Sequence, residues 1–272
     1  MAGRNNGRGL ECLVVDLNTQ RDFCHSNGAA PVSNLEPLSI ALRHMTAWVR
    51  RNYAPVVSSI ESHRWCDLSD SGQPLCCLDG TPGQQKLEYT LLPKRSWIEA
   101  DNTLWCPLDV FHTYQQAIFR KHTDDLLSNP KADRLFTQIY ANEFILYGIS
   151  AEGSVKALAL GLLARGKKVT VVMDACGYWS NATADLAFRQ IGAKGAELVT
   201  VPALLKRRLS RRIRYSTREA DANGNGHAAG NGSNGRSGHT KPVRLTLRLS
   251  GSSRSDSIRP AKSRESRNGK GA

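Results

Sequence analysis

The side chains of this 272-residue chain that are best suited to chemistry follow short apolar segments. Asp16 ends one such segment, Glu61 and His63 follow a second, and Lys121 follows a third. A fourth segment leads through a glycine-containing turn to Ser154. A carboxylate, a lysine and a helix N-terminus that converge can carry out acyl transfer, because the lysine supplies fixed positive charge and the helix amides can bind an oxyanion.

The elements that must position these groups alternate along the chain. Apolar, β-branched runs predict strands at residues 11–17, 55–60, 116–120, 143–149, 169–173 and 197–201. Helical spacing predicts helices at residues 34–54, 131–140, 151–165 and 182–190. The alternation predicts a three-layer α/β/α fold around a mainly parallel sheet, whose strands end at one shared edge. Residues 66–102 have no sustained period, and we expect a long excursion there with short hairpin pieces.

The charge is distributed unevenly. The chain has 37 Lys+Arg and 24 Asp+Glu, a formal net charge of +13. Residues 206–272 hold 17 Lys+Arg against 4 Asp+Glu, so the whole excess lies there. We therefore expect a polar lead at residues 1–10, one domain at 11–205, and a Gly/Ser/Arg-rich, mostly disordered basic tail at 206–272. Such a tail could bind nucleic acid or another polyanion without sequence selectivity, or it could be a solvated appendage with no partner.

The apolar segments and the cysteines indicate in which cellular compartment the protein is expected. No apolar run approaches the roughly 20 residues that span a bilayer, and the first residues lack an apolar stretch of signal-peptide length. Seven cysteines, an odd number in an otherwise ordinary composition, fit a reduced protein better than a disulfide scaffold. These features predict a cytoplasmic protein without a membrane partner.

Five segments in order resemble the isochorismatase-like hydrolases, which include nicotinamidases, other cysteine amidohydrolases and isochorismatase. The segments are VVDLNTQRDFC (14–24), LDGTPGQ (78–84), FRKHTDD (119–125), GISAEGSVKALALGLLARGKKVTVVMDACG (148–177) and TADLAFRQIGAKGAELV (183–199). The resemblance covers about residues 11–201 and implies a six-stranded parallel sheet with a catalytic aspartate, lysine and cysteine at the strand ends.

Carried over by position, the resemblance implies that Asp16 is the acid/base, Lys121 the charged partner and Ile149–Ser150 a cis peptide beside the oxyanion site. Ser154 stands where the family has its cysteine. Three interpretations follow. Ser154 is a hydroxyl nucleophile or positions water in the hydrolysis of a small amide. Alternatively, Asp16 protonates an isochorismate-like vinyl ether without a thiol. In the third, the site is silent and the fold serves binding or scaffolding.

The resemblance also suggests a metal position and a pocket. Glu61, His63 and Cys76 stand near the family's metal ligands and could hold zinc, which accepts oxygen, nitrogen and sulfur. The other interpretation is that His63 lines the substrate pocket, with Phe23 and Trp65, and that Cys76 packs in its loop. We expect no cofactor otherwise. Because family relatives often assemble, a homo-oligomer is expected.

Overall fold

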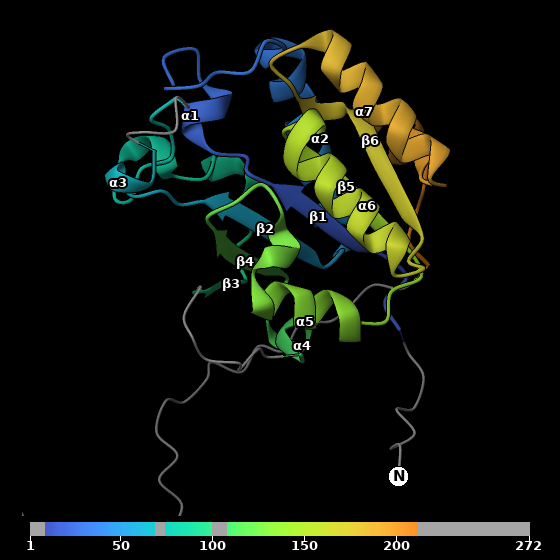
Figure 1. Ribbon diagram of the computed structural model, residues 1–272. Coiled ribbons are helices and arrows are strands. Elements are labelled where there is room, and N and C mark those ends of the chain that lie inside the picture. The colour runs from blue at the N-terminus through green and yellow to red at the C-terminus, as the bar shows by residue number, and fades with distance from the viewer. Residues whose placement is uncertain (1–8, 69–73, 100–107, 211–272) are drawn as a thin grey trace, which may run out of the picture. The chain divides into compact units, whose positions relative to one another are not determined.

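The computed structural model describes residues 9–68, 74–99 and 108–210, all within the first of two compact units, Met1–Ala220. Their centre is a seven-stranded sheet with the order β3-β4-β2-β1-β5-β6-β7 and parallel pairing throughout (Figure 1). The strands are β1 Leu13–Leu17, β2 Val56–Glu61, β3 Arg95–Ile98, β4 Gln116–Lys121, β5 Phe144–Ile149, β6 Val169–Gly177 and β7 Glu197–Val199. The predicted α/β class is confirmed, and the basic tail beyond residue 210 lies outside the described residues.

The sheet has one strand more than the six that were predicted. The additional strand, β3, lies inside the excursion at residues 66–102, where hairpin pieces were expected, and pairs in parallel with β4. Three of its four residues are exposed or partly exposed, because β3 forms one edge of the sheet. The inner strands were predicted from their continuous apolar runs, and an exposed edge strand such as β3 has no such run.

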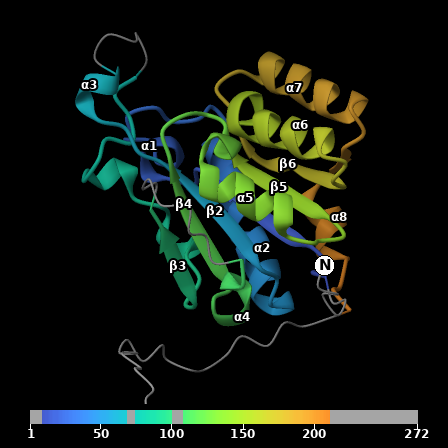
Figure 2. The ribbon, with the colours of Figure 1, turned by 60° about the horizontal axis from the view of Figure 1, so that its bottom comes forward.

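Helices cover both faces of the sheet. Helix α2 packs on one face together with α8, and α5, α6 and α7 lie on the other (Figure 2). The helices are α1 Arg21–Cys24, α2 Leu35–Asn52, α3 Trp65–Leu68, α4 Val110–Thr113, α5 Pro130–Gln138, α6 Lys156–Ala164, α7 Asn181–Ala193 and α8 Val201–Leu205. Three short 3₁₀ turns complete the described segments, at Pro82–Gln84, Glu88–Thr90 and Leu126–Ser128. None of the described helices is long and apolar enough to cross a membrane.

The two layers of helices bury the central strands on both faces. Every residue of β1 and β5 is buried, which explains their nearly uninterrupted apolar sequence. Strand β5 passes close to β1 at Gly148, whose φ is +123°. A Cβ at this position would lie 2.1 Å from the carbonyl oxygen of Leu17, so only glycine fits.

The segment after β5 differs from the continuous helix predicted at 151–165. It begins with a π-helical turn, Ala151–Val155, and α6 starts only at Lys156. The Ser150 hydroxyl caps this turn by accepting a hydrogen bond from the Gly153 amide at 3.0 Å. Ser154 therefore lies on a widened turn at the end of β5, a kind of irregularity that is frequent at functional sites.

Candidate functional site

Four polar side chains meet where neighbouring strands end. Asn18 follows β1, Glu61 and Lys121 are the last residues of β2 and β4, and Ser154 lies on the turn after β5. Glu61 and Lys121 are register partners in the parallel sheet, so their side chains start at the same level. The site therefore forms at the carboxyl edge of the sheet, as the alternating pattern predicted.

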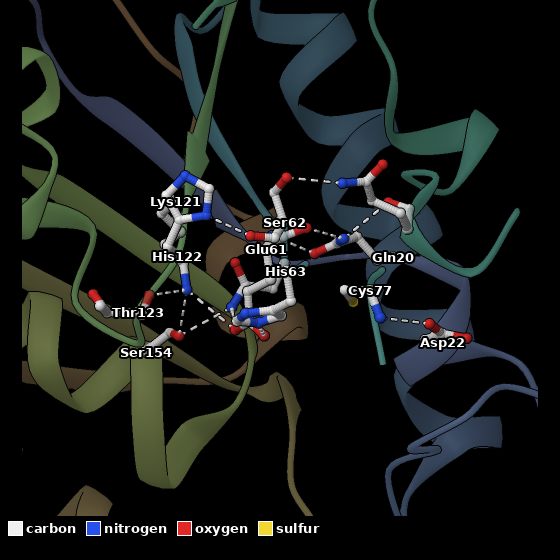
Figure 3. A network of polar contacts seen from close by, with 12 residues as sticks. Gln20, Asp22, Glu61, Ser62, His63, Cys77, Lys121, His122, Thr123 and Ser154 are labelled. Atoms are coloured by element: carbon white, nitrogen blue, oxygen red, sulfur yellow. Dashed lines mark hydrogen bonds and ion pairs between the residues drawn. The ribbon is translucent and has the colours of Figure 1, made fainter. Parts of the chain in front are cut away.

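Lys121 is the centre of this group (Figure 3). It is 1% exposed, and its Nζ lies 3.1 Å from Glu61 Oε1, 2.8 Å from the Thr123 carbonyl oxygen and 3.2 Å from Ser154 Oγ. An ammonium group has three N–H donors, so all three are used. The predicted proximity of Lys121 and Ser154 is thus observed.

Asn18 is the second residue that contacts the serine. Its Nδ2 lies 2.9 Å from Ser154 Oγ, 2.8 Å from the Ile149 carbonyl oxygen and 2.6 Å from Glu61 Oε1. The Ser59 hydroxyl donates to Asn18 Oδ1 at 2.7 Å, which turns the amide nitrogen toward the serine. Asn18 was not among the residues predicted for the site, although a polar residue directly after a buried strand is a signal that could have identified it.

Asp16 makes different contacts from those expected of the acid/base. Its carboxylate forms a buried ion pair with Lys86 at 2.8 Å and accepts hydrogen bonds from Thr19 and Ser58 at 2.9 and 3.3 Å. Within the part of the chain that the structure describes, no hydrogen bond or ion pair joins it to Ser154. The acid/base role implied for Asp16 therefore stays a prediction, since the side chain at the end of β1 that directly contacts the serine is a different one. β1 ends at Leu17 and Asn18 adopts a left-handed φ of 50°, so it is Asn18 that reaches the serine.

The carboxylate that does belong to the site is Glu61. Burial acts to raise its pKa, but Lys121 and the hydrogen bond from His63 outweigh burial and hold the pKa below the ordinary value. Glu61 Oε2 lies 3.4 Å from His63 Nε2, and this hydrogen bond raises the pKa of the imidazole. Glu61 is therefore ionised at neutral pH and is committed to Lys121, Asn18 and His63.

The arrangement surrounds Ser154 Oγ with donors. Both Asn18 and Lys121 donate to this oxygen, and Ser154 is 1% exposed. Two donors can stabilise negative charge on an oxygen, but neither can remove the hydroxyl proton while Lys121 is an ammonium paired with Glu61. The geometry therefore supports charge stabilisation rather than base-assisted nucleophilic attack.

The turn implied for the oxyanion site is present. The peptide bond between Ile149 and Ser150 is cis, as the resemblance implied. The Ile149 carbonyl oxygen accepts the hydrogen bond from Asn18, and the Ser150 carbonyl oxygen accepts from the Val155 amide at 3.0 Å. The turn is thus tied both to the end of β1 and to its own π-helical segment.

The residues predicted to line a pocket occupy different environments. Phe23 is buried and packs edge-to-face against Trp179, with 5.8 Å between ring centroids. His63 is mostly buried beside Glu61. Trp65 is 64% exposed on α3, so its ring does not fill the space beside Ser154. Trp179, which closes over Phe23, had not been selected from the sequence.

The residues suggested for zinc do not form a metal site. Among the described residues, no three or more His, Cys, Asp and Glu side chains are grouped so that they could hold an ion. Glu61 instead uses one carboxylate oxygen for Lys121 and Asn18 and the other for His63. Cys76 is partly buried, and a hydrogen bond with Cys77 lowers its pKa. The residues present thus do not fit the predicted ligand set.

The parallel sheet, the lysine at the end of β4 and the cis turn before Ser154 define a three-layer α/β fold with a polar site at the strand ends. Residues 12–203 match the model of the isochorismatase domain. The chain therefore belongs to the isochorismatase family of hydrolases.

Solved structures agree on the fold. The nicotinamidase/pyrazinamidase PncA from Bacillus subtilis has 16% identity and a TM-score of 0.56, covering 70% of this chain and 100% of that one. An isochorismatase family protein from Desulfovibrio vulgaris subsp. vulgaris str. Hildenborough has 18% identity and a TM-score of 0.56, covering 72% and 97%.

The pyrazinamidase of Pyrococcus horikoshii, solved in complex with zinc, has 18% identity and a TM-score of 0.53, covering 70% and 99%. No curated protein matches the chain in sequence.

Proposed function

We propose that this chain is a catalytically silent member of the isochorismatase family, which uses the fold for binding or scaffolding. The observation that carries the proposal is the pair of hydrogen bonds that Ser154 Oγ accepts from Asn18 and Lys121. The chemistry of the family's cysteine amidohydrolases needs a thiol and an aspartate that takes its proton. Here the two groups in contact are a hydroxyl and a carboxamide, which keep the shapes of a thiol and a carboxylate but not their acid–base behaviour.

The vinyl-ether route is also poorly supported. It requires a carboxylic acid that is still protonated near neutral pH, and hence a raised pKa. Glu61 has a lowered pKa because of Lys121 and His63. Asp16 is held in its own ion pair with Lys86.

A second candidate is a hydrolase that acts on a small amide through Ser154. One observation favours it, namely the 3.2 Å contact between Lys121 Nζ and Ser154 Oγ. If a substrate displaced Glu61 from Lys121, the lysine and the serine would be left as a Ser–Lys pair of the kind that some hydrolases use. The substrates would be small amides such as nicotinamide and pyrazinamide.

The test is hydrolysis of nicotinamide, pyrazinamide, other small amides and isochorismate by the wild type and by Lys121→Met. The silent interpretation predicts no turnover that depends on Lys121. Turnover by the wild type that is lost in both Lys121→Met and Ser154→Ala would overturn it and establish the second candidate.

A gain-of-function variant makes a negative result informative. The triple variant Asn18→Asp/Glu61→Gln/Ser154→Cys supplies the thiol and the neighbouring carboxylate, and Glu61→Gln removes the competing charge beside Asn18. Hydrolysis by this variant but not by the wild type would show that the rest of the site is intact and that the replacements silence it.

A further inference from the structure

The outer face of α2 is strongly basic. Its inner face buries Leu38, Leu42, Met45 and Val49 in the core, which fixes the opposite side toward solvent. From residue 43 to the end of the helix, the exposed side chains are Arg43, His44, Ala47, Arg50 and Arg51. The only acidic residue of α2 is Glu36, in the first turn.

A second basic segment lies beside this face. The chain that leaves α8 runs along the end of α2, where Trp48 Nε1 donates to the Arg207 carbonyl oxygen at 3.0 Å. The Leu209 amide lies 3.4 Å from Asn52 Oδ1 and fixes the same segment. Lys206 and Arg208 are exposed there. We call the surface formed by Arg43, Arg50, Arg51, Lys206 and Arg208 the α2–α8 surface.

One end of the α2–α8 surface is hollowed. Arg43, Thr46, Ala47, Arg50 and Tyr89 line a shallow groove. The Arg43 guanidinium stacks on the Tyr89 ring at 4.2 Å from its centroid. Arg50 Nη2 lies 3.3 and 3.2 Å from the carbonyl oxygens of Tyr89 and Leu91, which holds this arginine at the groove. A guanidinium has five N–H donors, so these contacts leave donors for a phosphate.

Part of the positive charge of α2 can be explained by the helix dipole alone. Arg50 and Arg51 lie in the last turn of α2, where cations interact favourably with the helix dipole. Lys206, the C-cap residue of α8, shares that reason, but it does not extend to Arg43, two turns earlier on α2, or to Arg208, which lies beyond the end of α8. Glu88, the exposed residue before Tyr89, and Glu11, which accepts hydrogen bonds from Ser210, bring two carboxylates to this surface, and these do not balance its five cations.

We propose that the α2–α8 surface binds the phosphate backbone of nucleic acid. Five cationic side chains from two segments flank the exposed side of α2. Arg51, whose Nη2 lies 3.5 Å from the Leu205 carbonyl oxygen, lies between them, and Arg43 and Arg50 are held at a groove by Tyr89. Lys206 and Arg208 belong to residues 206–272, which together carry 17 Lys+Arg against 4 Asp+Glu. Binding through phosphates is favourable because it releases counterions, and it requires no reading of the bases. This inference does not depend on whether the strand-end site is active.

The experiment measures binding of the full chain to a fluorescein-labelled single-stranded RNA and to DNA of the same sequence, over a series of salt concentrations. The test variant is Lys206→Glu/Arg208→Glu. The control is Arg189→Glu/Lys194→Glu, which changes the net charge equally at an exposed residue of α7 and at its exposed C-cap residue. Helix α7 lies on the opposite face of the sheet from α2 (Figure 2).

The α2–α8 proposal predicts that the test variant weakens binding about tenfold more than the control and lowers the slope of log affinity against log salt by about 1.4. Arg43→Glu should give an intermediate loss. RNA and DNA should bind alike, because the contacts are to phosphates. Equal losses in the two double variants, no binding by the wild type, or binding of RNA alone would overturn the proposal. If Lys206→Glu/Arg208→Glu does not fold, Lys206→Gln/Arg208→Gln makes the same comparison with a control of Arg189→Gln/Lys194→Gln.

Discussion

The side-chain amide of Asn18 donates a hydrogen bond to Ser154 Oγ at 2.9 Å, and Asn18 Nδ2 also lies 2.6 Å from Glu61 Oε1. This relationship ties the end of β1 to the turn after β5 and depends on a donor at residue 18. A carboxylate in the same position would face Glu61 and the Ile149 carbonyl oxygen, both of which are acceptors. Asn18 and Glu61 are therefore a matched pair.

The first prediction concerns this pair. Asn18→Asp should destabilise the fold by about 1–3 kcal/mol at neutral pH, because two adjacent carboxylates do not both ionise freely. The loss should shrink as the pH is lowered, since one carboxyl then takes up a proton. The double variant Asn18→Asp/Glu61→Gln should recover most of it, because the amide at 61 can donate to the new carboxylate. Urea unfolding of the four proteins measures the coupling, and additive losses would contradict a matched pair.

The second prediction concerns the ion pair between Glu61 and Lys121. The pKa of Glu61 is lower in the folded protein than its ordinary value of 4.5, so its stabilisation is present above that value and is lost as the pH falls through the lowered pKa. Glu61→Gln should cost about 3–5 kcal/mol at neutral pH, because Lys121 is left charged and buried. It should also flatten the acid side of the stability curve.

The control for this ion pair is Glu61→Gln/Lys121→Met, which removes both charges and should regain part of the loss. Unfolding free energies over an acid-to-neutral pH series provide the measurement. An unchanged acid limb in Glu61→Gln would show that Glu61 does not carry the pH dependence.

The third prediction tests whether the ion pair between Asp16 and Lys86 stabilises the fold. Its ion pair with Lys86 is buried, with both side chains 1% exposed. Asp16→Asn should therefore cost about 3–5 kcal/mol, and Asp16→Asn/Lys86→Met should recover part of this loss. A thermal or urea unfolding series checks the stability. If Asp16→Asn were neutral for stability, the structural role given to this ion pair would be wrong.

The fourth prediction tests the charge that the site directs at residue 154. A thiol introduced by Ser154→Cys would lie beside Lys121 and Asn18, two donors that favour the thiolate. Its pKa should fall below that of an ordinary cysteine, and adding Lys121→Met should raise it. Adding Asp16→Asn should leave it nearly unchanged, since Asp16 pairs with Lys86. The ultraviolet absorbance of the thiolate as a function of pH, with wild-type protein subtracted, gives each value.

The central strands and the helix α2 could be predicted because the sequence pattern of each lies within its own segment. Strands such as β1 and β5 are buried on both faces, so their apolar runs are visible in the sequence. The amphipathic spacing of α2 likewise marks the face that packs on the sheet. β3 could not be recognised in this way, because an edge strand with exposed side chains has no distinctive pattern.

The sequence by itself determined the family and the edge of the sheet where polar groups collect, and it predicted that Ser154 stands at the position of the family's cysteine. It did not determine which residue at the end of β1 faces that serine. Asp16 and Asn18 are both polar and lie two residues apart in the sequence. The left-handed backbone conformation at Asn18 turns this residue toward the serine, and Asp16 forms its ion pair with Lys86, which lies on a loop far away in the chain. Hydrogen bonds and ion pairs between strands that are far apart in the chain depend on the three-dimensional register of the sheet. For this reason only the tertiary structure decided that Glu61, rather than Asp16, supplies the carboxylate beside Lys121.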